Sequence, residues 1–144
     1  MLKFLHLADI HLGTNQYNSP HNTRKKDFFY ALNDVISTYA IKKNVDFVLI
    51  AGDLFDKSRI DPNTLNHAIV VFTALKEANI PVFVIEGNHD IPWGNQDVIS
   101  WMKFLDEQGY ITLLKTDFTE DQFIFDVHHF NDQVRILGTK WLGS

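Results

Sequence analysis

Residues 81–90 read PVFVIEGNHD and decide how this chain is organised. Pro81 opens an apolar run and Gly87 closes it, so the run predicts a buried strand that ends in a sharp turn. The turn then carries an amide, an imidazole and a carboxylate on Asn88, His89 and Asp90. Such side chains are uncommon in a core and suit a metal site. The stretch therefore predicts a strand whose end binds a ligand.

Two other apolar stretches, residues 2–8 and 46–51, predict strands. Apolar side chains at helical spacing predict helices over residues 25–43 and 62–78, and Asp61 followed by proline is typical of a helix N-terminus. Strand, helix, strand, helix and strand thus alternate. This order predicts an α/β fold, in which helices flank a layered sheet joined by right-handed crossovers.

The second half of the chain has a different pattern of predicted secondary structure. A helix is expected over residues 97–108, with Gly109 as its stop. Strand-like runs and polar turns then alternate, with strands expected at 110–114, 123–127 and 134–137 and turns at 116–122 and 131–133. No linker or internal repeat divides the chain, so one domain or part of one is expected.

Composition limits the classes of function. The chain has no cysteine, which excludes disulfides and thiolate metal sites and favours a reducing cytoplasm. No stretch reaches the ~20 apolar residues of a transmembrane helix, and the N-terminus lacks the pattern of a signal peptide, so no membrane association is expected. The net charge of −5 argues against nucleic-acid binding unless the acidic residues hold cations.

Polar clusters follow all three of the first predicted strands. They are Asp9 with His11, Asp53 with Asp56, and the turn at 88–90. Parallel strands bring their carboxyl ends to one edge of the sheet, where α/β proteins bind ligands. Carboxylates, imidazole and amide oxygen without sulfur suit manganese, iron or zinc better than copper. Since a carboxylate can bridge two cations, and a pair ~3.5–4 Å apart is the usual device for hydrolysing phosphate esters, the clusters predict that chemistry.

The clusters also carry a family resemblance. Residues 9–11, 52–56 and 87–90 resemble the first three motifs of the calcineurin-like metallophosphoesterases. The longer strings at 6–13 and 85–90 resemble the SbcD-type nuclease subunit of the SbcCD DNA-repair complex and its archaeal and eukaryotic counterparts. The resemblance implies a metal-dependent exo- or endonuclease of DNA double-strand-break repair, with two divalent metal ions, expected to be manganese. It also implies DNA, an SbcC-type ABC ATPase and a second copy of the chain as partners, and a cytoplasmic or nucleoid-associated location.

The resemblance assigns roles residue by residue. Asp9 and His11 are expected to bind the first metal, Asp53 to bridge both metals, and Asn88 to bind the second. His89 is expected near the scissile phosphate, as general acid to the leaving oxygen or as a stabiliser of the transition state.

Other residues near the motifs are expected to play supporting parts. Asp90 is expected to fix a neighbouring group rather than to bind metal. Lys57 and Arg59 could contact a DNA backbone, although solvated charge is the commoner role of such residues. His6 is expected to pack in the core. Asp56 stands where several relatives carry a further histidine, so detail tied to that histidine does not transfer.

The family pattern continues with a later histidine and a Gly-His-x-His motif, and neither occurs before Ser144. Residues 1–144 are therefore expected to be the N-terminal part of a nuclease domain that is truncated before its C-terminal metal ligands. Two alternatives remain at this stage. One is a small-molecule phosphodiesterase or phosphatase on the same scaffold, and the other is an inactive unit that only folds and dimerises.

Overall fold

The computed structural model describes residues 1–14, 23–92, 98–119 and 121–142. Its main sheet, within this part of the chain, has four parallel strands in the order β1-β2-β3-β4. The strands are β1 (Phe4–Leu7), β2 (Phe47–Ala51), β3 (Val82–Ile85) and β4 (Thr112–Leu113). The predicted α/β fold with a parallel sheet is thus confirmed.

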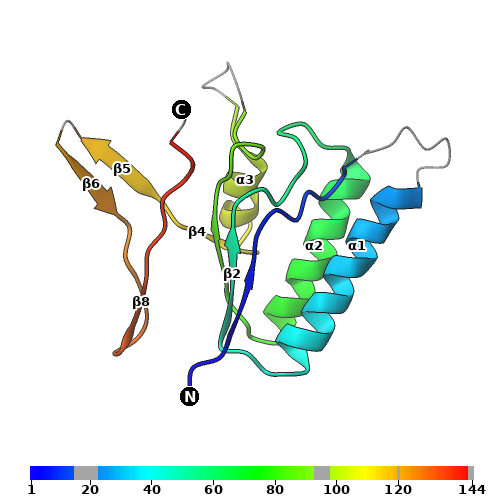
Figure 1. Ribbon diagram of the computed structural model, residues 1–144, viewed down its shortest axis with the longest axis horizontal. Helices are drawn as coiled ribbons and strands as arrows, with labels where there is room; N and C mark the ends of the chain where they lie inside the picture. The colour runs from blue at the N-terminus through cyan, green and yellow to red at the C-terminus, as the bar shows by residue number, and fades with distance from the viewer. Residues whose placement is uncertain (15–22, 93–97, 120, 143–144) are drawn as a thin grey trace.

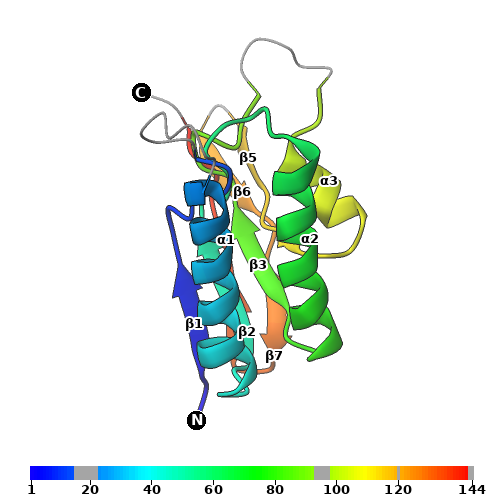
Figure 2. The ribbon, with the colours of Figure 1, turned by 90° about the vertical axis from the view of Figure 1, so that its right-hand side faces the viewer.

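Helices cover one face of this sheet, as Figures 1 and 2 show from two directions. They are α1 (Thr23–Val35), which continues as the π-helical segment η1 (Ile36–Ile41), and α2 (Pro62–Glu77). The Asp61 carboxylate caps α2 by accepting the Thr64 N–H at 3.0 Å, as the sequence predicts. Asn44 follows η1 with a φ of 47°, a left-handed conformation that ends the helical run. Of the described helices, none is both long and apolar enough to span a membrane.

The main core lies between these helices and the sheet. Its fully buried members include Val48 and Val84 from the central strands and Val71, Phe72 and Leu75 from α2. Burying each such side chain contributes roughly 1.5–3 kcal/mol relative to exposure. This packing makes the sheet rigid up to the carboxyl ends of its strands, where the polar clusters begin.

The opposite face of the sheet carries an antiparallel hairpin, β7 (His128–Asn131) with β8 (Val134–Ile136). Phe130 places its ring 5.0 Å from that of Phe47, and Ile136 is buried in the same cluster. Figure 1 shows the hairpins on the side away from α1 and α2. His6 is exposed, so the prediction that it packs in the core is wrong. Its strand is at the edge of the described sheet, whereas the hairpin packs against β2 and β3.

A second antiparallel hairpin corrects the turn expected at 116–122. Residues in that range form β5 (Thr116–Thr119), which pairs with β6 (Gln122–Phe125). Phe118 lies opposite Phe123, with ring centroids 4.8 Å apart, and Thr119 lies opposite Gln122. Cross-strand aromatic pairing favours a strand despite the polar residues, so the turn is shorter than its composition suggests.

Helix α3 (Trp101–Glu107), which packs beside β4, is shorter than the predicted helix over 97–108. It begins late because the Ser100 hydroxyl accepts the Lys103 N–H at 3.1 Å and caps it there. Residue 97 lies outside the described residues. Gly109, with a φ of 69°, follows the helix as expected.

Candidate metal centre

The loop that follows β1 is hydrogen-bonded to the loop that follows β2. The His11 N–H donates to the Asp53 carbonyl at 3.0 Å, and the Leu12 N–H donates to the Leu54 carbonyl at 2.8 Å. Parallel pairing therefore continues beyond the regular strands. Because the main chains are joined in this way, the side chains of the two loops are held at fixed positions relative to each other.

The backbone is unusual at three of the four predicted ligand positions. Asp9, His11 and Asp53 have φ values of 52°, 50° and 51°, in the left-handed region that residues other than glycine rarely adopt. Each such residue costs on the order of 1–3 kcal/mol and persists only where its surroundings hold it. Here the paired loops supply that support. Strained backbone of this kind concentrates at functional sites.

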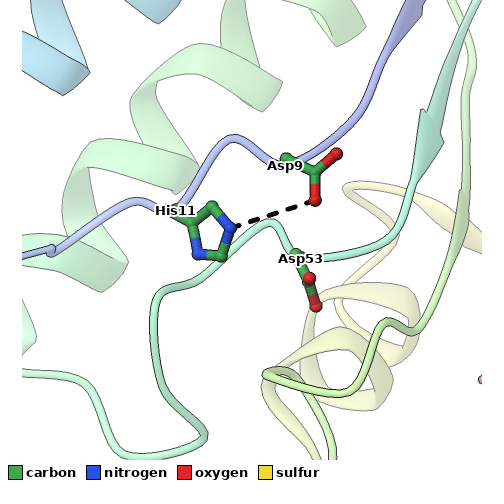
Figure 3. A group of neighbouring side chains, drawn as sticks. All are labelled: Asp9, His11 and Asp53. Carbon is green, nitrogen blue, oxygen red and sulfur yellow. Dashed lines mark ion pairs between the residues drawn. The ribbon is translucent and has the colours of Figure 1, made fainter.

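These three residues form a group that can hold a cation. Figure 3 shows Asp9, His11 and Asp53 on neighbouring loops, with the contact between Asp9 and His11 dashed. One ligand atom from each lies within 4.8 Å of the other two, and Nε2 of His11 is 4.0 Å from Oδ1 of Asp9. Atoms with such spacing can each lie about 2.0–2.6 Å from a common centre. Two carboxylates with one imidazole fit a divalent cation such as manganese, iron or zinc.

The loop that follows β3 reaches the same place because Gly87 has no side chain. A Cβ at Gly87 would lie 2.5 Å from the Asp53 amide nitrogen and closer still to its carboxylate. The His89 N–H can thus donate to Oδ1 of Asp53 at 3.0 Å. This close approach explains why the turn needs glycine before its polar residues, and it brings the third predicted cluster to the group.

His89 is exposed and lies beside His11. Their rings meet edge to face, with centroids 4.9 Å apart. Nδ1 of His89 is 2.6 Å from the main-chain oxygen of Asp56. The neighbouring Asn88 is also exposed and, with His89 and Asp56, lines an open cavity of about 310 Å³. A metal-binding role for Asn88 stays a prediction.

Asp90 is buried, with 2% of its surface exposed, and it links two of the loops. Its carboxylate accepts the Phe55 N–H at 3.1 Å and the Gly87 N–H at 3.0 Å. Burial raises the pKa of the Asp90 carboxyl above its ordinary value, and the nearby charge of Asp53 adds to this, although the backbone N–H groups oppose it. Asp90 therefore fixes main chain and does not belong to the ligand group.

The two predicted DNA contacts lie on the segment between β2 and α2. Lys57 is exposed and lines the cavity beside Asn88 and His89. Arg59 is exposed as well but is not among the residues that line it. Contact of either side chain with DNA stays a prediction.

Asp56 is the residue that sequence reasoning left without a role. Oδ1 of its carboxylate is 3.6 Å from Nδ1 of His11, and its main-chain oxygen holds His89. One sequence signal was its place in the second polar cluster, which turn formation explains equally well.

Comparisons with known proteins agree with this geometry. The family described as calcineurin-like phosphoesterase matches residues 2–142. The DNA double-strand break repair protein Mre11 of Archaeoglobus fulgidus is 48% identical over 89 residues, which cover 62% of this chain and 19% of that protein. The protein of the same name from Methanosarcina mazei is 41% identical over 108 residues, covering 75% of this chain and 16% of that protein. The uncharacterized metallophosphoesterase YhaO of Bacillus subtilis is 32% identical over 143 residues, covering 94% of this chain and 35% of that protein.

The chain thus spans about a fifth of the length of the first Mre11 proteins that it matches.

Proposed function

Because this chain belongs to the calcineurin-like phosphoesterase family, we propose that it builds the metal-binding edge of a DNA nuclease that acts in double-strand-break repair. One observation carries the proposal: Asp9, His11 and Asp53 converge within 4.8 Å on two loops that are hydrogen-bonded to each other. The Mre11 relatives support the choice of DNA over a small phosphate ester, since their name refers to DNA double-strand break repair. The reaction proposed is hydrolysis of a phosphodiester bond.

We propose Asp53 as the ligand that bridges two cations. It lies between the loop after β1 and the loop after β3, and one of its carboxylate oxygens already accepts the His89 N–H. We propose that Asp9 and His11 hold one cation, that Asn88 holds another, and that Asp53 binds both. The chemistry that two divalent cations supply in such a site is activation of water and neutralisation of phosphate charge.

His89 is proposed to act directly on the substrate. The Asp56 carbonyl oxygen can only accept a hydrogen bond, so Nδ1 of His89 must carry the proton in this contact. Nε2 is then the ring nitrogen that is available to contact the phosphate. In the imidazolium form Nε2 also carries a proton, which it can donate to the leaving oxygen or use to stabilise charge in the transition state. We propose that Lys57, which lines the same cavity, contacts the DNA backbone.

Two cations need about eight to twelve ligand atoms in all. Asp9, His11, Asp53 and Asn88 supply only part of that number. We propose that water, substrate oxygens and protein groups outside residues 1–144 supply the remainder. On this proposal residues 1–144 are the N-terminal part of a longer nuclease domain.

The finer proposals concern the cation and the partners. We propose manganese as the cation because the donor set is rich in oxygen and contains one imidazole. An SbcC-type ABC ATPase and a second copy of the chain are proposed as partners, with DNA as substrate, in the cytoplasm or at the nucleoid. These proposals follow from the resemblance of the motifs at residues 6–13 and 85–90.

The test is cleavage of linear double-stranded DNA by the complete gene product, with manganese added or chelated. Asp53→Asn and His89→Ala are each expected to lower the rate by about 10²-fold or more, since each removes a group that acts at the phosphate. Asp34→Asn, on the exposed side of α1, is the control and should leave the rate unchanged. Undiminished cleavage in both site variants would refute the roles. Turnover of a small nucleotide ester with intact DNA would favour the small-molecule phosphodiesterase instead.

A further inference from the structure

Asp56 lies against both imidazoles of the site. Oδ1 of its side chain is 3.6 Å from Nδ1 of His11, and its main-chain oxygen is 2.6 Å from Nδ1 of His89. The Asp56 N–H donates to the Leu12 carbonyl at 3.0 Å, so the main chain of Asp56 is tied to the loop that carries His11. One residue therefore faces the same ring nitrogen on two different histidines.

Nδ1 of His11 lacks a hydrogen bond although it is buried. No acceptor among the described residues lies within hydrogen-bonding distance of it. The Asp56 carboxylate, at 3.6 Å, is beyond the normal N–H···O range of about 2.7–3.2 Å. Its side chain is only 17% exposed, which keeps it inside the site. A small side-chain rotation would complete the bond and satisfy the buried nitrogen.

The other nitrogen of His11 faces the ligand group, since Nε2 is the atom near the Asp9 carboxylate. A histidine that binds a cation through Nε2 normally donates its Nδ1–H to a carboxylate or a carbonyl. That donation fixes the tautomer and orients the ring. The arrangement of Asp9, His11 and Asp56 has this order.

We propose that Asp56 is a positioning residue for His11. Its carboxylate accepts a hydrogen bond from Nδ1–H of His11, which leaves the lone pair of Nε2 directed at the cation. This inference rests on the proposed metal centre and adds a residue to it. It also explains why an aspartate serves at this position, because a carboxylate is a stronger acceptor than a neutral side chain.

The side chain of Asp56 is not needed to shape its loop. Main-chain hydrogen bonds from Leu12 to Leu54 and from Asp56 to Leu12 already hold the two loops together. Removing the carboxylate should therefore change the chemistry of His11 more than the fold. This separates a positioning role from a merely structural one.

The first test reads the tautomers of the metal-free chain by ¹⁵N NMR of the histidine rings, at mildly alkaline pH where an ordinary imidazole is neutral. In the wild type, the proton of His11 is expected on Nδ1. In Asp56→Ala, the population with the proton on Nε2 should rise. His89 should not change, because its acceptor is a main-chain oxygen that the substitution leaves in place. An unchanged His11 tautomer in a folded Asp56→Ala chain would overturn the proposal.

The second test measures the manganese affinity of the complete gene product by the electron paramagnetic resonance signal of the free ion. Asp56→Ala is expected to weaken binding about 10–100-fold, the usual effect of losing such a partner. Asp56→Asn should recover part of the loss, since its amide oxygen still accepts a hydrogen bond. Asp106→Asn is the matched control, because Asp106 is 21% exposed and pairs with Lys115 away from the ligand group. Its affinity should equal that of the wild type.

The outcomes distinguish failure of the proposed metal centre from failure of the positioning role of Asp56. If the complete wild-type gene product binds no manganese, the proposed metal centre fails, while the tautomer measurement still decides whether Asp56 controls His11. If the wild type binds and Asp56→Ala stays within about twofold of it, the positioning role is refuted. Thermal unfolding of each variant checks that the comparison is made on folded protein.

Discussion

Replacing Asp90 by alanine tests whether one buried carboxylate holds the loops of the site together. The substitution removes the acceptor of two main-chain hydrogen bonds, from Phe55 and from Gly87. A hydrogen bond to a charged group contributes about 1.5–3 kcal/mol, and a buried N–H left unpaired costs about 1–3 kcal/mol. Relief of the desolvation of Asp90 offsets part of this loss. A net destabilisation of about 2–4 kcal/mol follows, which is large against a total stability of roughly 5–15 kcal/mol.

The pH dependence of this effect has a definite sign. The pKa of Asp90 is raised in the folded chain above its ordinary value of 3.8, so the folded state binds the proton more tightly than the unfolded state. The stabilisation linked to this proton is fully present below the ordinary pKa. It is lost as the pH rises through the raised pKa. The difference in stability between wild type and Asp90→Ala should therefore be larger at acidic than at neutral pH.

Urea unfolding at several pH values measures both quantities. Asp90→Asn should be milder than Asp90→Ala, because it keeps the size of the side chain and one acceptor oxygen. Asp34→Ala, on the exposed side of α1, is the control, and its free energy of unfolding should stay within about 0.5 kcal/mol of the wild-type value. A loss below about 0.5 kcal/mol for Asp90→Ala at neutral pH would show that the two N–H groups find other partners, and the linking role would be abandoned.

Three further outcomes are expected. Gly87→Ala should lower manganese affinity at least about tenfold in an ion titration, because the added Cβ cannot fit beside Asp53. The control Gly109→Ala should leave this affinity unchanged and should lower the free energy of unfolding in urea by about 1 kcal/mol. Manganese at a hundred times its dissociation constant should raise the unfolding free energy by about 2.7 kcal/mol, a gain that chelation reverses and that Asp53→Asn removes. Phe130→Ala should destabilise the chain by about 2–3 kcal/mol through lost contact with the sheet, whereas Phe118→Ala, 64% exposed, should cost below about 1 kcal/mol. Equal effects of the two alanine substitutions in unfolding experiments would contradict the assignment of the second face.

The sequence by itself determined the order of the strands and helices along the chain and the places where polar residues follow the parallel strands. Local signals suffice for this: apolar runs mark β1, β2 and β3, helical spacing marks α1 and α2, and Asp61 and Gly109 mark helix ends. The convergence of Asp9, His11 and Asp53 could also be expected, because parallel strands end at one edge. The sequence predictions were wrong where local composition competes with strand pairing, as for β5, or where a capping residue such as Ser100 moves the start of a helix.

Only the tertiary structure decided how the polar turn at residues 87–90 works. Gly87 lies against Asp53, Asp90 spans two loops, and the main chain at His11 turns left-handed because the neighbouring loop holds it. The part played by Asp56 emerged in the same way, from its distances to His11 and His89. These contacts join residues more than thirty positions apart in the chain. Local periodicity does not encode them, since they depend on how three loops pack at the end of one sheet.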